Sequence, residues 1–184
     1  GRMQATVVCA LVVESEHCEC PSAGEEALTT ATSHTFWRDQ DDPSNGPYEP
    51  LLALFDQAEC IVAYNGLDFD FPLLRKHYGL GKTAQRRYIE HRSKCHDPFA
   101  KLRAATDVWF KLDQLLRANH LPAKTGTGLE AIKLWRDGNR ADLEAYCKQD
   151  VASLARMTML ETLDAPNVGA VHNRIHGVAS ALAG

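Results

Sequence analysis

The chain carries acidic residues at three separate points where carboxylates could hold divalent metal ions. Glu14 and Glu16 follow an apolar stretch, Asp70 lies where an apolar segment gives way to a helix, and Asp150 lies on a late helix. Oxygen ligands of this kind suit Mg²⁺ and Mn²⁺. Two such ions about 3.5–4 Å apart can stabilise both the attacking and the leaving oxygen of a phosphodiester. These residues therefore predict metal-dependent phosphodiester chemistry.

The first two carboxylates are spaced so that they can act together. Glu14 and Glu16 follow the apolar run Val7 to Val13, which has the length of a buried strand. Residues i and i+2 of an extended chain point to the same side, so both side chains can face one metal pair. The alternative is that the two acidic side chains mark the exposed end of the strand.

The other two carboxylates are expected beside helices. Asp70 lies in the segment 64–72, where a strand stops, the chain turns and a helix begins. Capping of that helix is the alternative role for Asp70. Tyr146 and Asp150 are four residues apart on the last long helix and share one face of it. Asp150 borders the apolar stripe of that helix, where a buried carboxylate needs a cation or hydrogen bonds, and a solvated side chain is the alternative.

Strands and helices in alternation must position these residues. We expect strands at 5–14, 27–32, 35–38, 61–64 and 93–96, and helices at 49–58, 68–78, 98–104, 111–119, 129–136 and 139–161. Such alternation indicates an α/β domain. The consecutive early strands favour an antiparallel group joined to parallel strands, which makes a mixed sheet flanked by helices. In such folds ligands bind beyond the carboxyl ends of the strands. Residues 162–184 show no firm pattern.

Composition narrows the class of protein. The length of 184 residues suits one compact domain, and the formal net charge of −4 argues against a protein that coats nucleic acid, while leaving an enzyme open. The run Val7 to Val13 is too short to cross a bilayer. We expect Cys9, Cys60 and Cys147 to be reduced core residues. An intracellular protein of the cytoplasm or nucleus, not a secreted one, is therefore expected.

A basic segment lies between the second and third acidic points. Within residues 75–103, lysines and arginines far outnumber the acidic residues. Contact with phosphates is one interpretation, and an ordinary solvated charge run is the other. Phe69, beside Asp70, could stack on a terminal base or belong to the core. The candidate nucleic-acid contacts are Asn65, Phe69, Arg86, Arg87, Arg92 and Lys94.

Taken together, the three acidic segments resemble the DEDD superfamily of 3′–5′ exonucleases, which includes polymerase proofreading domains. The pattern of that superfamily is Asp-x-Glu after the first strand, then Asn-Gly…Phe-Asp, then Tyr-x-x-x-Asp or His-x-x-x-x-Asp on a late helix. The matching segments here are 14–16, 64–70 and 146–150, in the same order over roughly residues 5–160. Ala145 excludes the histidine form, so the chain is similar to the tyrosine (DEDDy) subclass.

The resemblance implies a fold, a reaction and a ligand set. It implies an RNase H-like exonuclease domain over 3–162, followed by a tail at 163–184. Glu14, Glu16, Asp70 and Asp150 would hold two divalent cations, Mg²⁺ or Mn²⁺, and Tyr146 would orient the attacking water. The substrate would be the 3′ end of single-stranded DNA or RNA, shortened by one nucleoside 5′-monophosphate at a time.

One departure from the pattern keeps other functions open. Glu14 stands where the superfamily has Asp, which places the carboxylate one methylene further from the backbone. A catalytically weak or inactive nucleic-acid-binding module is therefore an alternative, and an RNase H-like endonuclease is another. The presence of all four acids and Tyr146 argues against the first, and the spacing of Tyr146 and Asp150 argues against the second.

Overall fold

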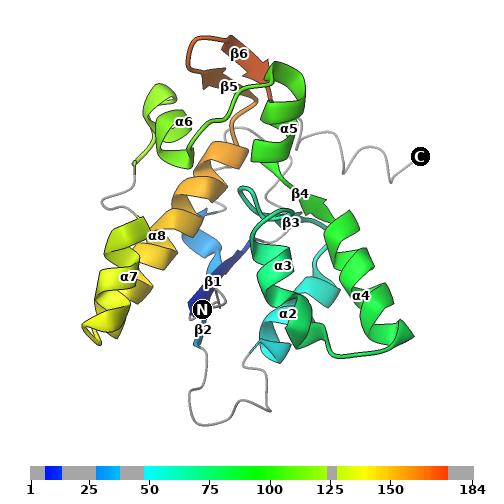
Figure 1. Cartoon of the computed structure of the whole chain (residues 1–184). Coiled ribbons are helices and arrows are strands. Elements are labelled where there is room, and N and C mark those ends of the chain that lie inside the picture. The colour runs from blue at the N-terminus through cyan, green and yellow to red at the C-terminus, as the bar shows by residue number, and fades with distance from the viewer. Residues whose placement is uncertain (1–6, 14–27, 38–47, 124–127, 174–184) are drawn as a thin grey trace. The chain divides into compact units, whose positions relative to one another are not determined.

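The computed structural model describes residues 7–13, 28–37, 48–123 and 128–173 (Figure 1). The chain forms two compact units. The first unit consists of residues 1–8 and 35–101, and the second unit consists of residues 9–34 and 102–184. Strands β1 (Val7–Val12) and β2 (Thr32–Trp37) pair with each other, and the division between the units falls within both strands.

The first unit is built from short helices and one parallel strand pair. Its elements are α2 (Glu49–Gln57), β3 (Ile61–Val62), α3 (Asp70–Leu74), the 3₁₀ helix η3 (Arg75–Tyr78), α4 (Lys82–Ser93), β4 (Cys95–His96) and the start of α5 (Pro98–Thr106). In the parallel pair, Ile61 is opposite Cys95 and Val62 is opposite His96. The core includes Tyr48, Leu51, Leu52 and Phe71, all buried. Burial of large apolar side chains is the main force that holds such short elements together.

A polar network anchors α4 to the rest of the first unit. His91 is 1% exposed, and its Nδ1 accepts from the Tyr78 hydroxyl (3.0 Å) while its Nε2 donates to Asp56 (2.8 Å). Arg87 binds both carboxylate oxygens of Asp56, at 3.0 and 2.6 Å, and also pairs with Glu49 at 2.8 Å. Burial lowers the pKa of His91, so the ring is neutral, and Arg87 lowers the pKa of Asp56. The network joins α2, η3 and α4.

The second unit consists of helices and a hairpin. It contains the end of α5, then α6 (Leu112–Ala118), α7 (Gly128–Arg136), α8 (Arg140–Thr158), β5 (Thr162–Ala165) and β6 (Gly169–His172). Strands β5 and β6 pair antiparallel. The Asn119 side chain accepts a hydrogen bond from Asp164 N at 2.8 Å and donates one to Asp164 O at 3.0 Å. The buried Asn173 amide donates to Met157 O and to Leu160 O, which closes the carboxyl end of α8.

Most of the expected helices are confirmed. Helices α2, α7 and α8 begin and end within a few residues of the predicted bounds. Gly79 and Gly138 end helices with φ of +83° and +72°, the left-handed conformation that glycine adopts without steric cost. The expected helix 68–78 is divided into α3 and η3. No described helix combines the length and the hydropathy that a membrane span requires.

Other expectations were wrong. Residues 28–30 are helical where we predicted a strand over 27–32, because β propensity depends strongly on packing partners. Cys60 is exposed rather than part of the core. Residues 162–172 form a hairpin where no pattern was evident; its turn places Asn167 and Gly169 at positive φ.

Helix α4 was not predicted because it has no continuous apolar stripe. Its residues are mostly charged or polar, and the buried side chain that it contributes is His91. Specific polar contacts, rather than an amphipathic pattern, hold it in place. The described strands form three separate pairs, β1-β2, β3-β4 and β5-β6. The parallel component is confirmed by β3 and β4, while their union in one mixed sheet stays a prediction.

Candidate functional site

Two loops of the first unit leave the sheet at the carboxyl ends of neighbouring parallel strands. The segment 63–69 follows β3, and Asp97 follows β4. The strands are still joined at this edge, because Ala63 N donates to His96 O at 3.2 Å. This edge is where α/β folds place their ligands, and it brings the segment before Asp70 next to Asp97.

Asp97 organises both loops through its carboxylate. It is 3% exposed and accepts from four backbone N–H groups. Asn65 N lies 2.9 Å from Oδ1, and Leu67 N lies 3.1 Å from Oδ2. Phe99 N and Ala100 N donate to Oδ1 at 3.1 and 3.3 Å, which caps the first turn of α5. One buried carboxylate thus ties the turn after β3 to the helix after β4.

The turn itself requires special residues. Asn65 adopts φ of +60°, a conformation that Asn tolerates better than most residues. A Cβ on Gly66 would lie 2.3 Å from the Ala63 Cβ, so no larger residue fits there without displacement. Gly66 O accepts from Phe71 N at 2.9 Å, which leads the chain into α3. The same Cβ position lies 3.6 Å from Asp70 Oδ2, so the Asp70 carboxylate lies close to the turn.

This packing predicts a measurable cost for Gly66→Ala. We expect the variant to lose about 1–3 kcal/mol of unfolding free energy, the usual cost of overpacking. Urea unfolding of the variant and of the wild-type chain measures it. Because the collision is with the Ala63 Cβ, adding Ala63→Gly to the variant should recover part of the loss. A double variant no more stable than Gly66→Ala would show that the collision is not the cause.

The Asp70 carboxylate is electrostatically suited to a cation. Loss of solvation among the surrounding protein atoms raises its pKa to about 6, although the residue keeps an exposed surface, and the negative charge of Asp97 acts in the same direction. A divalent cation would remove both penalties by pairing with the ionised form. Asp70 therefore fits the role of a metal ligand. In the described parts of the chain, no three His, Cys, Asp or Glu side chains gather as a metal site.

The remaining predicted ligands divide between the second unit and residues outside the description. Tyr146 and Asp150 lie on α8, both half-buried and four residues apart on one helix face. Glu14 and Glu16 lie outside the described residues. The structure thus brings Asp70 and Asp97 together in the first unit and aligns Tyr146 with Asp150 in the second. The convergence of all four predicted carboxylates stays a prediction.

Three of the four basic candidates have partners inside the protein. Arg87 binds Asp56 and Glu49, Arg92 donates to Leu67 O at 2.6 Å, and Lys94 donates to Asp56 O at 3.2 Å.

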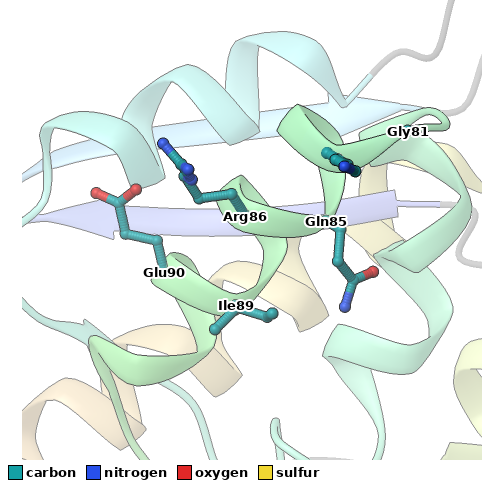
Figure 2. Close-up of a pocket in the computed structure, with 6 residues that line it drawn as sticks. Gly81, Gln85, Arg86, Ile89 and Glu90 are labelled. Carbon is teal, nitrogen blue, oxygen red and sulfur yellow. The ribbon is translucent and has the colours of Figure 1, made fainter.

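Arg86, by contrast, is exposed on α4, beside an open hollow of about 720 Å³ lined by Gly81, Lys82, Gln85, Arg86, Ile89 and Glu90. Figure 2 shows the Arg86 and Glu90 side chains projecting from this helix. Phe69, the aromatic residue among the predicted nucleic-acid contacts, is 44% exposed and immediately precedes Asp70.

Asp97 was not among the site residues expected from the sequence. It lies within the basic segment 75–103, as one of the few acidic residues there. Asp97 directly follows residues 93–96, an expected strand, and this place at a strand end is the signal in the sequence that could have found it.

A comparison with models of protein families assigns the chain to a superfamily. The model of a family described as RNase H superfamily matches residues 28–160, a span that contains Asp70, Asp97, Tyr146 and Asp150 and begins after Glu16. No curated protein and no solved structure matched the chain. The family match covers well over half of the sequence and agrees with the mixture of helices and small sheets described above. The chain therefore belongs to the RNase H superfamily.

Proposed function

We propose that the protein is a metal-dependent 3′–5′ exonuclease that removes nucleoside 5′-monophosphates from the 3′ end of single-stranded DNA or RNA. Membership of the RNase H superfamily indicates a nuclease-like module that binds nucleic acid. The observation that carries the finer proposal is Asp70, whose carboxylate lies just beyond the ends of two parallel strands with its pKa raised to about 6. The Tyr146 and Asp150 spacing on α8 supports the tyrosine subclass.

The proposal assigns a role to each site residue. Glu14, Glu16, Asp70 and Asp150 would hold two divalent cations, Mg²⁺ or Mn²⁺, which when bound supply an activated water and neutralise charge on the departing 3′ oxygen. Tyr146 would orient that water by a hydrogen bond, because a phenol is a poor general base near neutral pH. This site requires the described strands to join in one mixed sheet within an RNase H-like domain over residues 3–162.

The nucleic acid would approach from the side of Asp70. Phe69 would stack on the terminal base, with Asn65 beside it, and Arg86 is the basic candidate whose exposure suits contact with a phosphate. Contacts to phosphate by Arg87, Arg92 or Lys94 would have to compete with their internal partners.

The cellular location forms part of the same proposal. Within the described residues, Cys9, Cys60, Cys95 and Cys147 are thiols rather than disulfides. Thiols persist in reducing compartments, which supports an intracellular protein of the cytoplasm or nucleus.

Degradation of an oligonucleotide labelled at its 5′ end tests the proposed activity. The substrate is supplied as single-stranded DNA and as RNA, with Mg²⁺, Mn²⁺ or EDTA. We expect a ladder that shortens from the 3′ end, is lost in EDTA, and is abolished by Asp150→Ala. Glu144→Gln is the matched control, because it also removes a carboxylate from α8. In the wild-type chain, that carboxylate pairs with Lys148 at 2.6 Å. Its activity should stay near the wild-type level.

A non-catalytic nucleic-acid-binding module is the second candidate. Two observations favour it: Glu14 replaces the Asp of the exonuclease pattern, and the family match begins after Glu14 and Glu16. An intact substrate with both metals, combined with retained binding of the oligonucleotide, would support this candidate. Activity gained by Glu14→Asp would then identify the longer side chain as the cause.

A further inference from the structure

We propose that Asp97 and Arg92 are positioning residues, which lock the turn at residues 65–67 and so set the place of the Asp70 carboxylate. The inference rests on the proposed function, in which Asp70 holds a metal ion. It gives Arg92 a role different from the phosphate contact that its position in the basic segment indicated. It also gives a role to Asp97, which was not among the site residues expected from the sequence.

The turn needs such a lock because its backbone is not held by regular pairing. Strand β3 ends at Val62 and α3 begins only at Asp70. Between them, Asn65 has a positive φ, and Gly66 lies tightly against Ala63. A backbone in a sparsely populated conformation persists only where surrounding contacts hold it. Those contacts fall on Asn65 and Leu67, five and three residues before Asp70.

Asp97 holds the turn by its N–H groups. Its two carboxylate oxygens accept separately from Asn65 N and Leu67 N, so both ends of the turn are fixed to one side chain. The carboxylate is buried, where a polar group left without its hydrogen-bond partner is costly. Its Oδ1 also caps α5 through Phe99 N, so the turn cannot shift without disturbing that helix.

Arg92 holds the turn from the other side. Its Nη1 donates to Leu67 O at 2.6 Å, so Leu67 is fixed at its N–H by Asp97 and at its carbonyl by Arg92. The guanidinium lies 5.8 Å from the Phe71 ring centre and 5.7 Å from that of Tyr88. These contacts suit the flat guanidinium better than an ammonium group. Helix α4 carries Arg92 and is itself anchored through His91 and Asp56.

A matched control is available at the same aromatic ring, that of Tyr88. Arg75 also lies over Tyr88, at 4.7 Å, but its side chain bonds Gln85. Arg75→Gln therefore removes a cation from the same aromatic cluster and leaves the hydrogen bonds of Leu67 to Asp97 and Arg92 intact. Arg92→Gln, in contrast, also removes the hydrogen bond to Leu67 O in the turn.

The variants to compare are Arg92→Gln, Arg92→Lys, Asp97→Asn and Arg75→Gln in the full chain. Asp97→Asn keeps one acceptor oxygen, for Asn65 and α5, and places an amide against Leu67 N. We measure Mn²⁺ affinity by calorimetry, hydrogen exchange at Asn65 N and Leu67 N, kcat on the labelled oligonucleotide, and oligonucleotide affinity at several salt concentrations.

Loss of the lock should change metal binding rather than phosphate binding. We expect Arg92→Gln and Asp97→Asn to lower Mn²⁺ affinity and kcat by about 10–100-fold, as for residues that orient metal ligands. Hydrogen exchange of Leu67 N should accelerate, with Arg92→Lys intermediate and Arg75→Gln unchanged. The salt dependence of oligonucleotide affinity should not change. A fall of about 0.7 in its logarithmic slope, with Mn²⁺ affinity unchanged, would instead make Arg92 a phosphate contact and overturn the inference.

Failure of the lock and failure of the proposed function give different results. If the wild-type chain cleaves nothing but the variants still lose Mn²⁺ affinity and Leu67 protection, the lock stands and the exonuclease proposal fails. If the wild-type chain is active and both Arg92 variants match it in metal affinity and exchange, the lock is overturned. Thermal unfolding identifies any variant that does not fold. Should Asp97→Asn be one, the two Arg92 variants decide the question.

Discussion

Replacing Asp70 with Asn should make the metal-free protein more stable while removing its activity. The carboxylate has a pKa of about 6 in the folded protein against 3.8 when unperturbed, because of lost solvation and then the charge of Asp97. The folded state therefore binds more protons than the unfolded state between these values. Protonation of Asp70 therefore contributes to the unfolding free energy. This contribution is complete below about pH 3.8 and is lost as the pH rises through 6. At pH 7.5 the ionised Asp70 lowers the unfolding free energy of the metal-free protein, and a neutral Asn does not.

Thermal unfolding in EDTA measures this destabilisation of the metal-free protein. At pH 7.5 the Asp70→Asn variant should melt at a higher temperature than the wild-type chain, and the difference should shrink as the pH is lowered toward 4. Added Mn²⁺ should reverse the order, because an ion that binds only the folded wild-type protein stabilises it by mass action. An Asn variant that melts lower than the wild type in EDTA at pH 7.5 would contradict the assignment.

The same substitution should nearly abolish nuclease activity. Loss of several kcal/mol of charge stabilisation corresponds to a rate lower by roughly 10³-fold or more. Because protons compete with the metal for Asp70, we also expect the metal affinity of the wild-type chain to decline below about pH 6. Asp113→Asn, which removes a carboxylate that pairs with Arg117 on α6, serves as the activity control.

His96 should make the folded protein sensitive to acid. Its side chain is 6% exposed on β4, and Lys101 Nζ lies 2.8 Å from its Nδ1. Burial, and then the Lys101 charge, lowers its pKa to about 4 from 6.5. The ring is therefore neutral, with Nδ1 accepting from the ammonium group. Within the described residues, its Nε2 has no hydrogen-bond partner.

The sign of the effect follows from the lowered pKa. Between about pH 4 and 6.5 the unfolded chain binds a proton at His96 that the folded chain does not, so stability falls as the pH is lowered through this interval. At about 1.4 kcal/mol per pH unit, the full interval costs roughly 3 kcal/mol. Above pH 6.5 the contribution is complete and no longer depends on pH.

Urea unfolding at a series of pH values tests this prediction. His96→Asn keeps an acceptor for Lys101 and cannot titrate, so its stability should decline less than that of the wild-type chain between pH 6.5 and 4. The comparison of the two chains removes contributions that both share, such as those of His91, whose pKa is also lowered. Parallel curves for the two proteins would show that His96 is not responsible.

Several features of the fold were predictable because they depend on neighbours in the sequence. The apolar spacing of α2, α7 and α8 marks their buried faces, and Gly79 and Gly138 mark helix ends through a backbone conformation that favours glycine. The short strands around Ile61 and Cys95 were expected, and they pair in parallel. Asp70 was proposed as a ligand because a strand, a turn and a helix follow one another within ten residues, and its role stays a prediction.

Helix α4 and the hairpin at 162–172 depend instead on contacts that no local pattern reports. The polar surface of α4 is stabilised by Arg87 and His91 reaching Asp56, more than 30 residues earlier in the chain. The hairpin is held partly by Asn119, which lies 45 residues before Asp164. Such hydrogen bonds form only after the backbone has brought the partners together, so their residues look like ordinary surface residues in the sequence.

For the candidate site, the sequence by itself determined which carboxylates could bind metal and in what order they occur. Only the tertiary structure decided that Asp97 lies under the turn before Asp70 and that Arg92 points inward to Leu67. The parallel pairing of β3 and β4 is the physical reason, because it places two loops 30 residues apart at one edge. There a single buried carboxylate can satisfy backbone groups of both loops, and the direction of each charged side chain follows from that arrangement.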